Sequence, residues 1–331
     1  MRRFLTTAAC ALLACAASAE ENMAGTGHTD YFGHKNCVVL ENADARVVLT
    51  GDGGGRVLEY SWKGKNAMYL SPTQKGWKWN PKEEAPWEGP TGGRLDIGPE
   101  TTIPAHPELW LGQWDVEITG PRRARMTSVE DGPTGVQLVR DFELAEEGSH
   151  LRCTQIIRNV SDEHQSWGHW SRTFAPGGGI VVIPLSETSR FPQHYIRYGP
   201  GPVMNFQPSD PAIRQRDGFL EVLGTPEQAK LGMDSTEGWF AYLMHHDQAF
   251  VKRYRTWPER VYGEMAALTI SIWYYKNEMC ELEPIGPLQP LDPGEAAAFT
   301  EDWYLLEWEY PAEGEDVDLR ALAAKVEAET R

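Results

Sequence analysis

Two glutamates near the end of the chain, Glu281 and Glu283, have the spacing and the setting that proton-transfer chemistry uses. They alternate with Cys280, Leu282 and Pro284, so an extended chain puts both carboxylates on one face and the apolar side chains on the other. A carboxylate in a concave site can act as a general base. A sheet face that simply points into solvent is the alternative, and it is the commoner setting for glutamate.

The segment that carries these glutamates resembles a strand, a turn and a returning strand. Alternation ends at residues 292–294, where Asp, Pro and Gly favour a turn. Phe299, Glu301 and Trp303 then repeat with period two beyond the turn. We therefore expect residues 280–303 to form one unit of sheet that positions Glu283.

Short strand-like runs, separated by turns rich in Gly, Pro, Asn and Asp, also dominate the rest of the chain. These runs are residues 38–41, 45–49, 56–62, 114–119, 123–129, 135–144, 151–159, 166–174, 180–184, 230–233, 238–245, 249–254 and 267–275. One helix is expected at residues 319–329, capped by Asp316 or Asp318. The pattern predicts an all-β fold, a large antiparallel β-sandwich with a short C-terminal helix.

The composition limits the partners. A chain of 331 residues with 41% hydrophobic and 11% aromatic residues has enough apolar side chains for a substantial core. Its formal net charge of -17 argues against nucleic acid or an anionic membrane surface as the partner. Neutral sugars or oligosaccharides fit this charge, and five tryptophans in residues 71–114 predict an ordered segment packed across the sheet.

The first 19 residues have the features of an export signal: a positive start, an apolar centre and a small-residue cleavage site. We expect a mature chain that begins at Glu20 and lies in the periplasm or outside the cell, with no transmembrane span. A lipobox-like sequence ending at Cys15 is the alternative, and it would leave a lipid anchor on that cysteine. The intact mass of the exported protein distinguishes the two.

The mature chain is expected to have a linker at residues 20–36, a sandwich domain at residues 37–310 and a helical tail at residues 311–331. Three cysteines remain in it, Cys37, Cys153 and Cys280. Their number and wide spacing do not indicate a disulfide framework.

Several short motifs occur in a recognisable order. A glycine-arginine turn ends at Arg56, a Gly-Gly-Arg-Leu sequence contains Arg94, and an asparagine turn precedes a strand with His169. Near the end, Glu283 is followed by a Leu-x-Pro-Gly-Glu turn at residues 291–295. Over about residues 38–308 this order resembles the galactose mutarotase-like superfamily, which includes the aldose 1-epimerases.

The resemblance implies a sandwich fold and an enzyme that interconverts sugar anomers without a cofactor. Glu283 would be the base and His169 the acid, about 5 to 10 Å apart on one concave face. The residues implied for substrate binding are Arg56 and Arg94 as hydrogen-bond donors and Trp110 and Trp170 as stacking platforms. Separately, the basic run at residues 250–255, which contains Arg253, suits a groove for an acidic, uronate-containing sugar, and a solvated strand face is the commoner alternative.

Two other functions remain open. A noncatalytic sugar-binding protein on the same scaffold is favoured if His169 is structural, because Trp170, Ser171 and Arg172 replace the residues that follow the histidine in the epimerases. A polysaccharide lyase or hydrolase is the third hypothesis, and a hydrolase needs two opposed carboxylates. The arginines and tryptophans also have ordinary structural explanations, as turn and core residues.

A metal site is not expected. His245, His246 and Asp247 offer ligand types in a row, but neighbours in a strand point to opposite faces, so a shared ion needs a bend there. The glycine-rich sequence before Arg56 lacks the Lys-Ser/Thr and the helix of a phosphate-binding loop.

Overall fold

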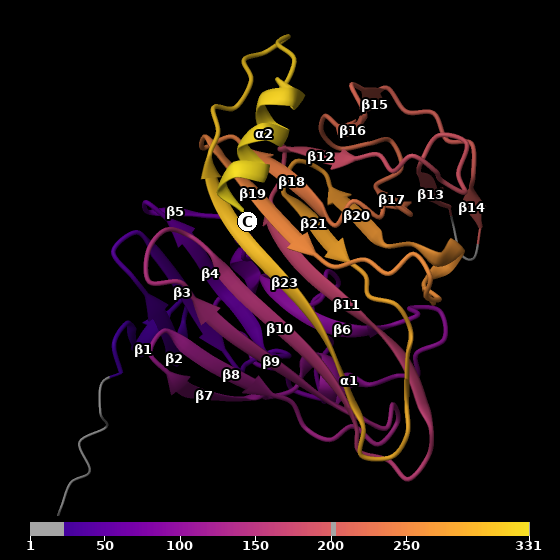
Figure 1. Cartoon of the computed structure of the whole chain (residues 1–331). Coiled ribbons are helices and arrows are strands. Elements are labelled where there is room, and N and C mark those ends of the chain that lie inside the picture. Colours follow the sequence, from indigo (N-terminus) through magenta and orange to yellow (C-terminus); the bar gives the residue numbers. More distant parts are fainter. Residues whose placement is uncertain (1–22, 200–202, 331) are drawn as a thin grey trace, which may run out of the picture.

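The structure is a computed structural model that describes residues 23–199 and 203–330, and these form two large antiparallel sheets (Figure 1). The 13-stranded sheet contains, in spatial order, β1 (Thr26–Tyr31), β2 (His34–Glu41), β3 (Ala45–Thr50), β4 (Arg56–Trp62), β6 (Gly93–Gly98), β11 (Gln165–Pro176), β21 (Met279–Pro284), β20 (Ile270–Tyr275), β17 (Lys230–Met233), β13 (Ile196–Tyr198) and β14 (Met204–Asn205), with β5 (Lys65–Asn66) beside β4 and β22 (Gln289–Leu291) beside β11.

The 10-stranded sheet contains β15 (Ile213–Arg216), β16 (Phe219–Val222), β12 (Ile180–Pro184), β18 (Trp239–Met244), β19 (Gln248–Tyr254), β23 (Ala296–Glu307), β10 (Leu151–Asn159), β9 (Val136–Leu144), β8 (Arg123–Thr127) and β7 (Asp115–Gly120). Along β10 every second side chain is buried, and the ones between are more exposed. Sheets with one apolar face bury it against each other. The predicted all-β sandwich is thereby confirmed.

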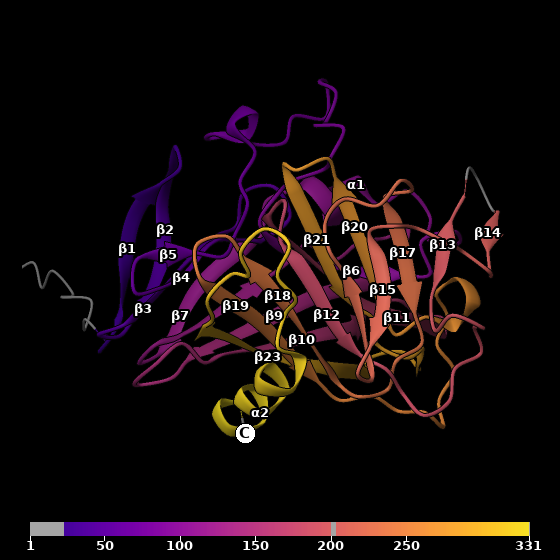
Figure 2. The same ribbon diagram turned by 90° about the horizontal axis from the view of Figure 1, so that it is seen from above.

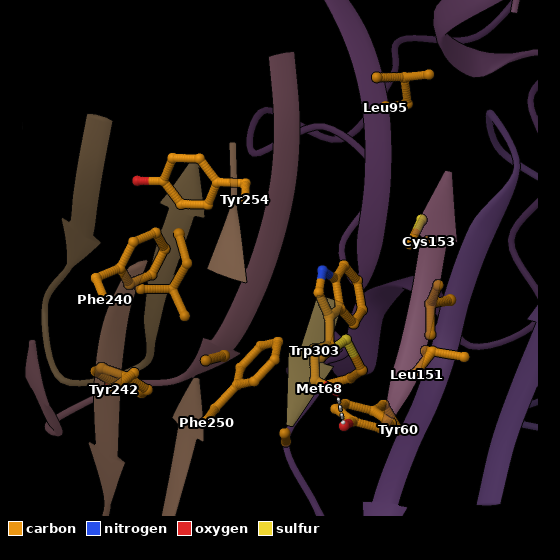
Figure 3. Packing of buried hydrophobic residues seen from close by; sticks show 14 of the residues in the cluster. Tyr60, Met68, Leu95, Leu151, Cys153, Phe240, Tyr242, Phe250, Tyr254 and Trp303 are labelled. Carbon is orange, nitrogen blue, oxygen red and sulfur yellow. Dashed lines mark hydrogen bonds between the residues drawn. The ribbon is translucent and has the colours of Figure 1, made fainter. Parts of the chain in front are cut away.

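The core lies between the two sheets and is rich in aromatic rings (Figure 3). Tyr60 of β4 meets two rings of the other sheet, with ring centroids 5.7 Å from Phe250 and 5.8 Å from Trp303. The single proton of the Tyr60 hydroxyl faces two acceptors, the backbone oxygens of Ser149 at 2.6 Å and Trp303 at 2.9 Å. The three cysteines, Cys37, Cys153 and Cys280, are buried as free thiols. Apolar packing and hydrogen bonds therefore hold these sheets together.

Helix α2 (Leu319–Glu329) confirms the one helix expected from the sequence. The side chain of Asp318 accepts a hydrogen bond from the backbone N–H of Ala321, which is the N-cap contact. Leu319, Leu322 and Val326 pack on the outside of the 10-stranded sheet, where Figure 2 shows the helix. No helix in the described part of the chain has the length and apolar character that crossing a bilayer requires.

A buried ion pair of the 10-stranded sheet lies in the core. Lys252 of β19 and Glu301 of β23 are both fully buried, with Nζ 3.1 Å from Oε2. Nζ of Lys252 also donates to Oγ1 of Thr173 at 2.8 Å and to the backbone oxygen of Leu282 at 3.2 Å. It thus bridges β11 and β21 of the facing sheet, one residue away from Arg172 and Glu283.

The segment 71–114 is ordered, as expected, and contains elements that sequence reasoning missed. It includes a 3-10 turn (Pro72–Gln74), strand β6 and the short helix α1 (Pro107–Leu111). The turn before β4 allows α1 to approach, because Gly54 has a φ of 83° and a Cβ there would lie 2.2 Å from the backbone oxygen of Trp110.

The structure corrects two expectations. Residues 26–36, assigned to a linker, form β1 and the start of β2 at the edge of the 13-stranded sheet. The expectation that residues 280–303 form one unit of sheet is wrong, because β21 and β23 lie in different sheets and do not pair. The expected export signal, with Cys15, lies outside the described residues.

Candidate functional site

Charged and aromatic side chains gather on the outer face of the 13-stranded sheet, the face turned away from the second sheet. β6, β11, β21, β20 and β17 are consecutive neighbours there, and cross-strand partners share a face. The outer-face residues given by this register are Arg94, Asp96, Trp170, Arg172, Glu281, Glu283, Ser271, Trp273 and Lys230. Leu95 and Leu282, which alternate with them, belong to the core, so the predicted alternation around Glu283 is confirmed.

Arg172 links the two carboxylates of this face. Its guanidinium donates to both oxygens of Glu281, at 2.8 and 3.3 Å, and its Nε lies 3.2 Å from Oε1 of Glu283. Burial alone would lower the pKa of Arg172, but Glu281 and Glu283 outweigh burial and raise it. Arg172 is therefore a permanent cation at the centre of the site. The sequence analysis did not select this residue.

Glu283 is the carboxylate with an altered affinity for protons. It is fully buried, and burial together with the charge of Glu281 raises its pKa to about 7, against the opposing effect of Lys230 and Arg172. Within the described residues, neither oxygen has a partner in hydrogen-bond geometry, so the contact with Arg172 is an ion pair only. Glu283 can therefore exchange a proton near neutral pH.

Lys230 of β17 supplies a second cation on the same face. Its Nζ donates to Oε2 of Glu100 at 2.9 Å and lies over the rings of Trp170 and Tyr198, at 5.1 and 4.9 Å from their centroids. Burial opposes the charge, but Glu283 and Glu100 raise the pKa of Lys230. Its ammonium therefore stays protonated, and it bounds the site beyond Glu283.

Helix α1 covers the other side of the site. Trp110 on this helix stacks on Arg94, with the guanidinium carbon 3.5 Å from the ring centroid, and also lies 5.0 Å from that of Arg172. His106, just before the helix, binds Asp96 through Nε2 at 3.0 Å and the backbone oxygen of Pro104 through Nδ1 at 2.8 Å. Burial opposes the charged imidazole, but Asp96 raises the pKa of His106. Both ring nitrogens thus face acceptors, which fits an imidazolium.

Arg56 is held by the segment that covers the site. Nη1 donates to Oε1 of Gln74, Nε donates to the backbone oxygen of Asp52, and Nη2 contacts Nε2 of His34 at 2.9 Å. Burial lowers the pKa of Arg56 to about 10. These contacts indicate that Arg56 has a structural role, which is to hold residues 71–92 in place. They do not support the expected contact of Arg56 with substrate.

His169 lies on the wrong face for the expected acid. Its Nε2 lies 3.2 Å from the backbone oxygen of Ala297 in the 10-stranded sheet, and its ring stacks on Phe299. Burial lowers its pKa to about 4, so the imidazole is neutral. Since neighbouring residues in β11 alternate, Trp170 and Arg172 face the site and His169 faces the core. The expected convergence of His169 with Glu283 is therefore wrong.

Arg253 lies far from this face. It is on the outside of the 10-stranded sheet, where Nη1 donates to the backbone oxygen and Oγ1 of Thr330, just after α2. It lines a separate cleft of about 440 Å³. Three other residues that were predicted to bind substrate, Arg94, Trp110 and Trp170, do lie together on the outer face of the 13-stranded sheet.

The turn between β18 and β19 contains the three possible ligands noted in the sequence. His245 binds the backbone oxygen of Gly178 through Nε2 and packs against Tyr310, and Asp247 has a φ of 61° within the turn. Among the described residues, no three His, Cys, Asp or Glu side chains form a group able to hold a metal ion.

Comparisons with known proteins bear on the fold. No protein-family model matches the chain, and no curated protein matches its sequence. Among solved structures, the Slr1438 protein of Synechocystis sp. PCC 6803 is similar with a TM-score of 0.58 and 13% identity, covering 85% of this chain and 99% of the other. A galactose mutarotase-like protein of Lactobacillus casei ATCC 334 has a TM-score of 0.56 and 12% identity, covering 82% and 100%.

A third similar structure is a galactose mutarotase-like protein of Clostridium acetobutylicum, with a TM-score of 0.54 and 12% identity over 86% of this chain and 99% of that one. These matches extend over nearly the whole length of each of the three solved structures. The chain therefore shares its fold with these galactose mutarotase-like proteins.

Proposed function

We propose that this protein is an exported enzyme of the aldose 1-epimerase type, which binds a pyranose on the outer face of the 13-stranded sheet and uses Glu283 as the base. The observation that carries the proposal is Glu283 itself, a buried carboxylate whose pKa of about 7 suits proton transfer at neutral pH. The superfamily fold supports a sugar as the ligand.

Interconversion of anomers requires removal of the proton from the anomeric hydroxyl and delivery of a proton to the ring oxygen. Arg172 holds Glu283 in place and stabilises its ionised form. Two protonated side chains, Lys230 and His106, are the candidates to deliver the proton in place of His169, and they lie on either side of Arg172. Trp110 and Trp170 supply aromatic surface for the apolar face of a sugar ring.

A noncatalytic sugar-binding protein is the second candidate, and the placement of His169 favours it. With that histidine in the core, the acid assumed by analogy with epimerases is absent from this face. A hydrolase is less well supported, because Glu281 and Glu283 contact the same guanidinium and so lie on one side of any bound sugar.

The test is the rate at which a pure anomer reaches equilibrium, followed by polarimetry or by the anomeric proton signals. The wild type should accelerate this for at least one sugar in a panel of neutral and acidic aldoses. A positioned base contributes roughly 10² to 10⁴ in rate. Glu283→Gln should therefore lose about that factor while its sugar affinity stays within about tenfold.

His169→Asn is the matched control, since it alters a polar group of the same strand on the opposite face. It should leave the acceleration close to the wild-type value. Lys230→Met and His106→Asn identify the proton donor, because only loss of the donor should reduce the rate as Glu283→Gln does. Saturable sugar binding without any acceleration would refute the enzyme and leave the sugar-binding protein.

A further inference from the structure

Arg94 is a buried cation that has no counter-ion in the part of the chain that the structure describes. Its side chain is fully buried, and within residues 23–199 and 203–330 no group accepts a hydrogen bond from Nε, Nη1 or Nη2. A guanidinium has five N–H donors and stays protonated in proteins. The indole of Trp110 covers one face of it at 3.5 Å, which leaves the donor edge without a partner.

The nearest carboxylates are already bound to other groups. Both oxygens of Glu281 accept from Arg172, and Oδ1 of Asp96 binds His106 and accepts from the backbone N–H of Ile97. Arg94 and Arg172 are also direct cross-strand partners. Like charges placed opposite each other in a sheet repel, and burial increases that cost.

The other large buried cations show the contrast. Arg140, behind the same strands, donates to the backbone oxygens of Gly55 and Gly93 through Nη1, and Lys252 has Glu301 beside it. Buried polar groups are nearly always hydrogen-bonded, and the exceptions call for a ligand, ion or water. On the face where Glu283 and Arg172 lie, Arg94 is the cation among these exceptions, and the oxygens of Glu283 also have no hydrogen-bond partner among the described residues.

We propose that the sugar bound at this site carries an anionic group, a carboxylate or a phosphate, whose oxygens accept hydrogen bonds from the guanidinium of Arg94. This rests on the proposed function, because it places the sugar next to Glu283 and Arg172. An oxyanion matches the fork of donors on a guanidinium and neutralises its charge. The substrate class is thus acidic sugars, with uronic acids and sugar phosphates as its two sources.

Gly89 forms part of the wall of the site beside Arg94. A Cβ at this position would lie 3.3 Å from Nη2 of Arg94 and 3.5 Å from the ring of Trp110, so the backbone of residue 89 closes directly over the pair. The neighbouring Trp87 is 65% exposed. Gln74 donates to the backbone oxygen of Gly89 at 2.8 Å, and the ring of Trp87 packs on Tyr275, so residues 87–89 form a fixed wall beside the guanidinium.

The experiment measures the binding of glucuronate, galacturonate, glucose 6-phosphate, glucose and galactose by calorimetry at low and high salt. Hydrogen bonds to a charged group contribute about 1.5 to 3 kcal/mol, or roughly a tenfold to hundredfold change in affinity. An acidic sugar should therefore bind at least about tenfold more tightly than its neutral counterpart, and salt should reduce the difference. Comparison of the affinity for the uronates with the affinity for glucose 6-phosphate shows which of the two, a carboxylate or a phosphate, the site prefers.

Arg94→Met should remove most of this preference while changing the affinity for neutral sugars much less, and Arg94→Lys should retain part of it. Removal of an uncompensated charge should leave the ligand-free variant at least as resistant to thermal unfolding as the wild type, which shows that it folds. Arg253→Met, on the other sheet, is the matched control and should keep the full preference.

Two outcomes separate this inference from the proposed function. Equal affinity of the wild type for neutral and acidic sugars, or a preference that survives Arg94→Met, overturns the assignment of Arg94 and leaves the sugar site intact. Failure of every sugar in the panel to bind or to react overturns both.

Discussion

The raised pKa of Glu283 makes its removal a stabilising change at neutral and alkaline pH. Glu283→Gln replaces the carboxyl group with a neutral amide of nearly the same shape, which resembles the protonated form that the buried site favours. Arg172 keeps its two hydrogen bonds to Glu281 in the variant. The substitution should therefore remove an unfavourable charge without leaving Arg172 unpaired.

The magnitude follows from the shift in pKa. The folded protein keeps the proton on Glu283 up to about pH 7, whereas the unfolded chain releases it near 4.5. Between these values the folded state binds more protons, so the stability of the wild type falls as the pH rises and levels off above pH 7. At 1.36 kcal/mol per pKa unit, the cost at pH 8 is about 3 kcal/mol, and it disappears near pH 4.

Urea unfolding of both proteins at pH 4.5, 6 and 8 measures this directly. Glu283→Gln should match the wild type at the lowest pH and exceed its free energy of unfolding by about 3 kcal/mol at pH 8. The control is Glu281→Gln, which removes the acceptor of the hydrogen bonds from Arg172 and should destabilise at every pH. A Glu283→Gln variant that is less stable than the wild type at pH 8 would refute the reasoning.

Two further predictions concern residues outside the site. Lys252→Met alone should destabilise by about 3 to 5 kcal/mol, because it leaves the buried carboxylate of Glu301 without its cation. Lys252→Met combined with Glu301→Gln should recover most of that loss, because the neutral amide keeps an oxygen that can accept a hydrogen bond; urea unfolding checks both variants, and additive effects would contradict the pairing. Asp318→Ala should cost about 1 kcal/mol through loss of the N-cap of α2, while Asp318→Asn should cost much less, and equal losses in thermal unfolding would show that the cap contributes nothing.

Alternation in the sequence predicted local geometry well. It identified the face that Glu281 and Glu283 share, because the period of two in a strand depends only on the backbone. The same rule, applied to β11, separates His169 from Trp170, and the two could never share one site. The sequence analysis nevertheless selected His169 together with Trp170, because it followed the resemblance to epimerases, and it did not select Arg172, which shares the face of Trp170.

The partners of each site residue could not be predicted in this way. Arg172 and Glu281 are 109 residues apart, and Lys230 belongs to a third region of the chain. Nothing in the local sequence around Lys230 or His106 marks either of them as part of a site. The presence of Lys230 and His106 at the site depends on the order of the strands in the sheet, which arises from the packing of the whole sandwich.

The sequence by itself therefore determined the strands, the C-terminal helix, the fold class and the face on which each strand residue lies. Each of these depends on the periodicity or the capping of a short segment. Only the tertiary structure decided that β21 and β23 lie in different sheets, that His169 faces the core and that Arg94 is left without a counter-ion. The physical reason is that burial and charge compensation are sums over neighbours from distant segments, and no local pattern contains those sums.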